Sequence, residues 1–94
     1  MIKSFNDQDT ELLFFGQKPR KLPSEIWNRG TRKLLILHAA TNLSELRVPP
    51  GNRLEKLKGD RSGQHSIRIN QQWRLCFQWR DGHAYKVEIT DYHN

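Results

Sequence analysis

Residues 73–90 read WRLCFQWRDGHAYKVEIT, and this stretch decides the fold. Its apolar side chains fall on every second position, which is the period of a β-strand with one buried face. The pair Asp81-Gly82 interrupts the alternation and favours a two-residue hairpin turn, since both central residues of that turn need a positive φ. The apolar positions are Trp73, Leu75, Phe77 and Trp79 before the turn and Tyr85, Val87 and Ile89 after it. The stretch therefore predicts two antiparallel strands whose apolar positions share one buried face.

A third strand is predicted just before this hairpin. His65, Ile67 and Ile69 alternate with polar residues, and residues 70–72 form the turn that leads into Trp73. One slip in register would move every alternate side chain to the wrong face, so the pattern also predicts which residues are buried. We therefore expect a twisted antiparallel sheet in which the strand that begins at Trp73 is central.

Two helices are predicted in the first half of the chain, where apolar residues recur at helical spacing. Asp7 is a suitable N-cap for the first helix, and Gly16 is a natural stop for it. The second helix is predicted from Pro23 to Ala40, although Gly30 within it costs about 1 kcal/mol relative to alanine.

The segments around these helices complete the predicted fold. Residues 2–5 alternate as a short first strand, and Leu43 and Leu46 add one more helical turn. The segment Pro49-Pro50-Gly51-Asn52 then ends helical structure. The fold class is therefore α+β, with a short N-terminal strand and two helices packed on one face of a twisted antiparallel sheet.

The length and composition indicate one globular domain, residues 1–94. The single cysteine, Cys76, excludes an internal disulfide and a cysteine-rich zinc site, and it fits a reducing compartment. No apolar run approaches the roughly 20 residues of a membrane span, and the N-terminus shows no signal-peptide pattern. We therefore expect a cytoplasmic protein with no membrane partner.

The net charge of +6 is concentrated in one third of the chain. Residues 47–80 carry eight basic residues against Glu55 and Asp60, whereas the charges before and after this segment roughly balance. The basic residues are Arg47, Arg53, Lys56, Lys58, Arg61, Arg68, Arg74 and Arg80. Such a local excess suits a polyanion, although a solvated basic surface is the simpler alternative.

The polar positions of the predicted strands share the face opposite the helices. Arg68, Arg74, Gln78 and Lys86 are expected there, and we expect that face to be uncovered. A twisted sheet makes such a face concave, and arginines that line it could hold a nucleic-acid backbone.

No familiar catalytic motif is present. The sequence lacks a glycine-rich phosphate loop, a nucleophile elbow and a helix with two zinc-binding histidines. The histidines have no metal-ligand spacing, and His38 and His65 are expected to pack in structural roles. Cys76 has nothing around it that marks a nucleophile, so it is expected to act as a small hydrophobic residue.

Three clusters could carry chemistry, and each has a plainer alternative. Residues 57–63 form a glycine-flanked polar loop that could be an ordinary turn, and Arg68 and Arg74 on neighbouring strands could simply pair with Glu88. The closing Asp91-Tyr92-His93 could be a frayed polar tail. Together they supply a base, an acid, cations for a charged phosphorane and a ring for an unstacked base. These are the requirements of RNA cleavage by a ribose 2′-hydroxyl, which needs no metal-activated water.

Five elements of the chain carry a resemblance to a known family. They are residues 49–63, Ser66-Ile67-Arg68, Trp73-Arg74-Leu75-Cys76-Phe77, the closing Asp91-Tyr92-His93 and the opening Ile2-Lys3-Ser4-Phe5. On these elements the chain resembles the HigB-type plasmid-maintenance killer toxins, a branch of the RelE/ParE toxin superfamily. The resemblance covers nearly the whole chain.

The resemblance implies the toxin of a type II toxin–antitoxin system. Such a toxin is an endoribonuclease that enters the ribosomal A site and cleaves mRNA by 2′-hydroxyl attack, without a metal or a cofactor, and so inhibits translation. The implied partners are the ribosome, its mRNA and a helix-turn-helix antitoxin that neutralises the toxin. Operator DNA is contacted only through that antitoxin.

The resemblance also implies site residues. Lys58 and Arg74 match positions implicated in phosphate contact and transition-state charge, and Asp91-Tyr92-His93 matches the terminal catalytic group. Some members carry a catalytic histidine where this chain has Glu55, so the division of acid and base roles stays open. The residues expected to bind RNA are Arg53, Lys56, Arg61 and Arg68.

Two other functions stay open at this point. ParE-type relatives share the fold but poison DNA gyrase, and the terminal Asp91-Tyr92-His93 and the basic strand face argue against that branch. A plain RNA-binding module would need only the net charge, and it would have no use for Asp91 and His93.

Overall fold

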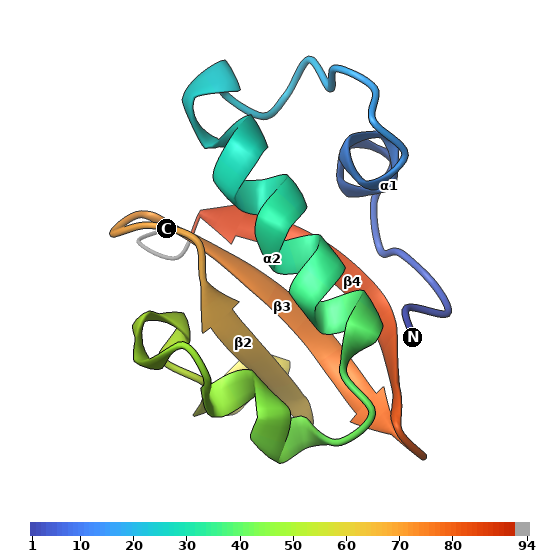
Figure 1. Cartoon of the computed structure of the whole chain (residues 1–94), viewed down its shortest axis with the longest axis vertical. Helices are drawn as coiled ribbons and strands as arrows, with labels where there is room; N and C mark the ends of the chain where they lie inside the picture. The colour runs from blue at the N-terminus through green and yellow to red at the C-terminus, as the bar shows by residue number, and fades with distance from the viewer. Residues whose placement is uncertain (92–94) are drawn as a thin grey trace.

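The computed structural model of the chain describes residues 1–91 and has the predicted α+β architecture (Figure 1). The two α-helices are α1 (Gln8–Phe14) and α2 (Trp27–Ala39), and the four strands are β1 (Glu55–Lys56), β2 (Gln64–Arg68), β3 (Trp73–Arg80) and β4 (His83–Asp91). Short 3₁₀ helices connect them: η1 (Ser24–Ile26), η2 (Leu43–Arg47), η3 (Pro50–Asn52) and η4 (Gly59–Arg61). The strands form one antiparallel sheet in the order β1-β2-β3-β4, and the helices lie on one side of it.

The β3–β4 hairpin forms as predicted, and β3 is an interior strand. Asp81 and Gly82 have φ values of 53° and 79°, the positive values that a tight two-residue turn needs. Leu75 and Phe77 are fully buried between the sheet and the helices. Trp73 is half-buried and packs against the same core. The predicted register of this strand is therefore confirmed.

A β-bulge in β4 moves one aromatic residue to the other face. Cys76 pairs with Glu88 and Gln78 pairs with Tyr85, so β4 has one more residue than β3 between these two pairs. Lys86, which lies in the bulge, takes a left-handed φ of 51°. Tyr85 consequently pairs with Gln78 on the polar face, where the guanidinium of Arg80 lies 4.4 Å from its ring centroid. The buried residues of β4 are Ala84, Val87 and Ile89. The prediction that Tyr85 shares the buried face is therefore wrong, because strict alternation does not survive an inserted residue.

The N-terminal segment lies along β4 without forming a regular strand. Two isolated parallel bridges join Ile2 to Ala84 and Phe5 to Val87. The helix α1 then begins at its predicted cap, since the side chain of Asp7 accepts a hydrogen bond from the backbone of Thr10 at 3.2 Å. The predicted first strand is thus an extended segment that hydrogen-bonds to the edge of the sheet.

Gly30 lets α2 approach its neighbours closely. A Cβ atom at this position would lie 3.0 Å from Cδ2 of Leu13 on α1 and 3.4 Å from Cδ1 of Ile89 on β4. Glycine lowers the stability of the helix itself, but its lack of a side chain lets α1, α2 and β4 pack closely at this point. Within residues 1–91 no helix is long and apolar enough to cross a membrane.

The segment after α2 is not free of helical structure. The expected end of helical structure at Pro49-Pro50-Gly51-Asn52 is wrong, because η3 forms within this segment and η4 follows it. The amide of Asn52, which is fully buried, donates to the carbonyls of Leu46 and Val48, both at 3.1 Å. Its oxygen accepts from the ammonium of Lys33. Asn52 thereby fastens this connection to α2.

Candidate functional site

The polar face of the sheet is covered in its centre by residues 53–63. Strand β1 extends the sheet, with Glu55 opposite Ser66, and the side chain of Arg61 in η4 reaches over the face to Glu88 and Thr90 on β4. The guanidinium of Arg61 donates to Glu88 at 2.7 Å and to Gln64 at 3.1 Å. Beneath this cover Cys76 is fully buried, and burial raises the pKa of its thiol. The expectation of an uncovered face is therefore wrong, because a loop without strand periodicity folds back onto it.

Arg74 is buried under the same cover rather than exposed on an open face. Only 6% of it is accessible to solvent. Its Nε donates to Oγ of Ser66 at 2.7 Å, and one Nη donates to the backbone carbonyl of Arg53 at 2.6 Å. The other Nη lies 3.8 Å from a carboxylate oxygen of Glu55, whose side chain is about half exposed. The structure thus holds Arg74 rigidly and turns part of its charge toward an accessible carboxylate.

The remaining basic residues of this segment divide into two groups. Arg53, Lys56 and Lys58 are exposed, and Lys58 precedes the first residue of η4. Arg61, in contrast, is occupied by its contacts to the sheet, and the hydrogen bond with Glu88 raises its pKa. Exposed cations therefore flank Glu55 along the chain, while Arg61 fixes the loop that carries Lys58.

Asp91 stands at the end of β4, in register with Trp73. Its Oδ2 accepts a hydrogen bond of 2.7 Å from the side-chain amide of Gln72. Thr90, the residue before it, is the register partner of Arg74, so Asp91 and Arg74 occupy neighbouring positions at one end of the sheet. The predicted residues Tyr92 and His93 lie outside the described residues.

Two histidines have the structural roles predicted for them. His65 stacks on Phe77 with ring centroids 6.1 Å apart, and burial, followed by the charge of Lys56, lowers the pKa of its imidazole. Nδ1 of His38 accepts the backbone N–H of Ile2 at 3.1 Å. Among residues 1–91, no three histidine, cysteine, aspartate or glutamate side chains gather closely enough to hold a metal ion.

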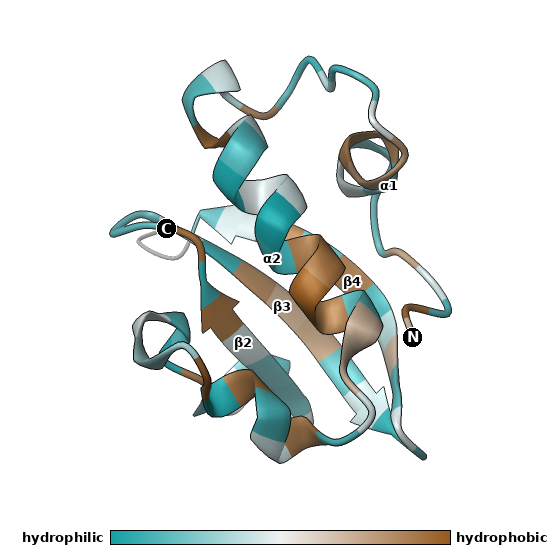
Figure 2. Ribbon diagram, viewed as in Figure 1, coloured by the Kyte–Doolittle hydropathy of each residue, from teal (hydrophilic) through white to brown (hydrophobic). Residues whose placement is uncertain are grey.

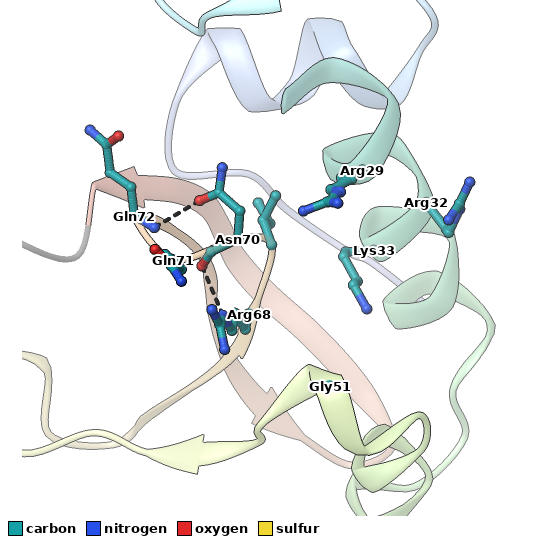
Figure 3. A pocket seen from close by; sticks show the side chains of 9 residues that line it. Arg29, Arg32, Lys33, Gly51, Arg68, Asn70, Gln71 and Gln72 are labelled. Carbon is teal, nitrogen blue, oxygen red and sulfur yellow. Dashed lines mark hydrogen bonds between the residues drawn. The ribbon is translucent and has the colours of Figure 1, made fainter. Parts of the chain in front are cut away.

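A groove of about 730 Å³ lies between α2 and the β2–β3 turn (Figure 3). It is lined by Arg29, Arg32 and Lys33 of α2, Gly51 of η3, and residues 68–72, which include the predicted RNA-binding residue Arg68. The three cations of α2 were not predicted to contribute, because the charges of residues 1–46 nearly cancel along the sequence. The spacing of positions 29, 32 and 33 was the available signal, since residues three and four apart share one side of a helix.

The fold is shared with known structures. The chain matches a structure of YafQ from E. coli with a TM-score of 0.64 and 12% identity, over 99% of this chain and 96% of that chain. It matches a structure of the YoeB-YefM complex from Staphylococcus aureus with a TM-score of 0.61 and 20% identity, over 100% of this chain and 99% of that chain. At these identities the likeness establishes the fold alone.

The sequence comparisons establish the family. Residues 3–93 match the family model described as the RelE-like toxin of type II toxin-antitoxin system HigB. The chain is 49% identical to Toxin HigB-1 of Vibrio cholerae over 85 residues, which are 89% of this chain and 90% of the relative. It is 37% identical to Endoribonuclease HigB of Proteus vulgaris over 93 residues, which are 99% of this chain and 100% of the relative. The chain therefore belongs to the HigB-like family of RelE-like toxins, as its motifs predicted.

Proposed function

We propose that this toxin is an endoribonuclease that cleaves mRNA in the A site of the ribosome and so inhibits translation. The observation that carries the proposal is Arg74, whose buried guanidinium is held by Ser66 and Arg53 while one Nη faces Glu55. Preorganised positive charge of this kind stabilises a transition state in which charge develops on a phosphate. The relative from Proteus vulgaris that matches 99% of the chain is itself named an endoribonuclease.

The proposed reaction is an attack by the ribose 2′-hydroxyl on the adjacent 3′-phosphate. The bond from O2′ to phosphorus forms, the bond to O5′ breaks, and the products are a 2′,3′-cyclic phosphate and a 5′-hydroxyl. A base takes the 2′ proton and an acid protonates O5′, with Glu55, Asp91 and His93 as the candidates. Arg74 and Lys58 stabilise the phosphorane, and Tyr92 holds an unstacked base. No metal or cofactor takes part in these steps.

The partners follow from the class of system. A toxin of a type II system has a cognate antitoxin, and here we propose a helix-turn-helix protein that neutralises the toxin and alone contacts operator DNA. The ribosome, its mRNA and the antitoxin would all meet the toxin in the cytoplasm.

Cleavage on programmed ribosomes tests this function against its two alternatives. Purified toxin is incubated with ribosomes that carry a defined mRNA, and the new 5′ ends are mapped. We expect cuts within the A-site codon that depend on the ribosome. Inhibition of gyrase without cuts would indicate a ParE-like poison, and binding without cuts would indicate a plain RNA-binding module.

Charge reversal around the site should weaken ribosome association more than reversal elsewhere. Lys56→Glu with Lys58→Glu changes two exposed cations beside Glu55, whereas Lys18→Glu with Lys21→Glu makes the same change in the loop after α1. When log affinity is plotted against log salt concentration, the slope should decrease in magnitude by about 0.7–0.9 for each phosphate contact that the first pair of substitutions removes. Equal losses from both pairs would mean that only the net charge matters. Arg61 is left intact, because its contacts hold the loop.

Glu55→Gln tests whether the exposed carboxylate acts as a base. A carboxylate is a weaker base than an imidazole at neutral pH, so we expect a loss near the lower end of the general-base range, about 10²-fold in single-turnover cleavage. The ion pair with Arg74 is partly exposed, and losing it alone would cost no more than about 1 kcal/mol, or roughly fivefold. A loss of fivefold or less would therefore make Glu55 a positioning residue for Arg74 and exclude it as the base.

A further inference from the structure

The groove between α2 and the β2–β3 turn concentrates positive charge outside the segment that carries Glu55 and Lys58. Its cations come from two distant parts of the chain, Arg29, Arg32 and Lys33 on α2 and Arg68 at the end of β2. Arg29 extends from the helix toward the β2–β3 turn, whereas Lys33 extends toward η3, where it donates to Asn52 (Figure 3). None of the residues that line the groove is acidic. The lining of the groove therefore carries positive charge and no negative charge.

The cations of α2 are crowded without being neutralised. Neither Arg29 nor Arg32 forms an ion pair with an acidic side chain of residues 1–91. Burial, followed by the charges of Arg32 and Arg29, lowers the pKa of Lys33. A bound anion would relieve this repulsion. The half of α2 that carries these residues is hydrophilic, whereas its C-terminal half is hydrophobic (Figure 2).

The groove is connected to the candidate site through two of its lining residues, Gln72 and Arg68. Gln72 lines the groove and donates to Oδ2 of Asp91 at 2.7 Å. Arg68 lines it as well and is the register partner of Arg74. A strand of RNA that passes Arg74 and Asp91 would therefore meet the groove directly beyond them.

We propose that this groove binds the backbone of the mRNA on one side of the scissile phosphate, an inference that rests on the proposed function. Arg29 and Arg32 contact phosphates, and the side-chain NH2 of Asn70, whose Oδ1 accepts the backbone amides of Gln72 and Trp73, donates to a sugar or base edge. The groove is thus a second RNA-binding surface, separate from residues 53–58.

The composition of the groove favours RNA over an acidic peptide. Stable peptide docking relies on apolar anchors that fill pockets. Here Ile69 is the one large apolar residue of the lining, and it is only 4% exposed. The remaining side chains are cations and amides, which match a phosphate backbone.

Binding of uncleavable RNA to the purified toxin tests the proposal. The probes are fluorescent 2′-O-methyl RNAs, a trinucleotide that spans the candidate site and a decanucleotide that also reaches the groove, and affinity is measured against salt concentration. The variant Arg29→Gln with Arg32→Gln keeps good helix formers at two exposed positions. The matched control is Lys18→Gln with Lys21→Gln, which removes the same charge from residues that do not line the groove.

For the decanucleotide, we expect the slope of log affinity against log salt concentration to be smaller in magnitude by about 1.4 in the groove variant. This is about 0.7 for each of two single-strand phosphate contacts removed. For the trinucleotide, the salt slope of the groove variant should equal that of the control variant. Equal behaviour of both variants on the decanucleotide would overturn the proposal. It would also be overturned if the groove variant bound the decanucleotide normally but lost affinity for empty ribosomes or for the antitoxin, since the occupant would then be ribosomal RNA or an acidic peptide.

Parallel cleavage assays on programmed ribosomes separate the two levels of inference. If the unmodified toxin cuts no mRNA, the proposed endoribonuclease function fails whatever the groove binds. If it cuts and the groove variant behaves as the control does in both assays, the groove proposal alone fails.

Discussion

Replacing Arg74 by alanine is expected to slow single-turnover mRNA cleavage by about 10²–10³-fold, comparable with the loss of one preorganised oxyanion donor. The same change should lower the free energy of unfolding by about 1–3 kcal/mol, because the buried acceptors on Ser66 and Arg53 lose their donors. Burial of this side chain makes the effect on stability unavoidable, whereas an arginine on an open face would have affected cleavage alone.

Two further variants separate the contributions of Arg74. Arg74→Lys keeps the positive charge but replaces the fork of donors with a single ammonium, so cleavage should fall less than in the alanine variant. Ser66→Ala removes one anchor and leaves the charge in place. Cleavage is measured at a temperature where thermal unfolding shows every variant to be folded. A folded Arg74→Ala protein that cleaves at the normal rate would remove Arg74 from the site.

Replacing His93 by alanine is expected to slow cleavage by about 10²–10⁴-fold, the usual contribution of a general acid or base. The role assigned to His93 comes from the resemblance of the terminal Asp91-Tyr92-His93 to the family. A residue that acts in catalysis and not in folding should change the free energy of unfolding by less than about 0.5 kcal/mol when it is replaced. This combination of a large kinetic effect and a small thermodynamic one distinguishes His93 from Arg74.

The test of His93 has its control at the neighbouring carboxylate. Asp91→Asn should also slow cleavage, either as the loss of a base or through altered orientation of His93. Gln72→Ala removes the hydrogen bond that the structure gives to Asp91, and it should have a smaller effect than Asp91→Asn. Normal cleavage by the His93→Ala protein would show that the terminal residues are only a polar tail.

The secondary structure could be predicted wherever one residue pattern repeats. Alternation through residues 73–80 and the Asp81-Gly82 turn determine the hairpin, since burial of one face and the positive φ values leave few alternatives. Strand β1 could not be found in this way, because two exposed residues have no period. Tyr85 was assigned to the wrong face because nothing in the sequence marks Lys86 as the left-handed residue of a bulge.

The candidate site depends on contacts between distant segments, so less of it could be predicted. The sequence placed Arg74 and Arg68 on adjacent strands, and the structure has them in register. It gave no sign that Arg61 would reach Glu88 and cover the polar face, because that contact joins residues 27 positions apart. Counting charge along the chain also missed Arg29, since the groove is assembled from a helix and a turn that only the fold brings together.

The space that Gly30 leaves open has a consequence for how the surface of this toxin can vary. Gly30 follows Arg29 directly, and its lack of a Cβ lets α2 rest against Leu13 and Ile89. Position 30 thus seats α2, the helix that carries Arg29, Arg32 and Lys33, close to the sheet. Alanine would add about 1 kcal/mol of helix propensity, but its methyl group would lie 3.0 Å from Cδ2 of Leu13, so that side chain would have to shift. The placement of the cations that line the groove therefore depends in part on a residue that does not line it.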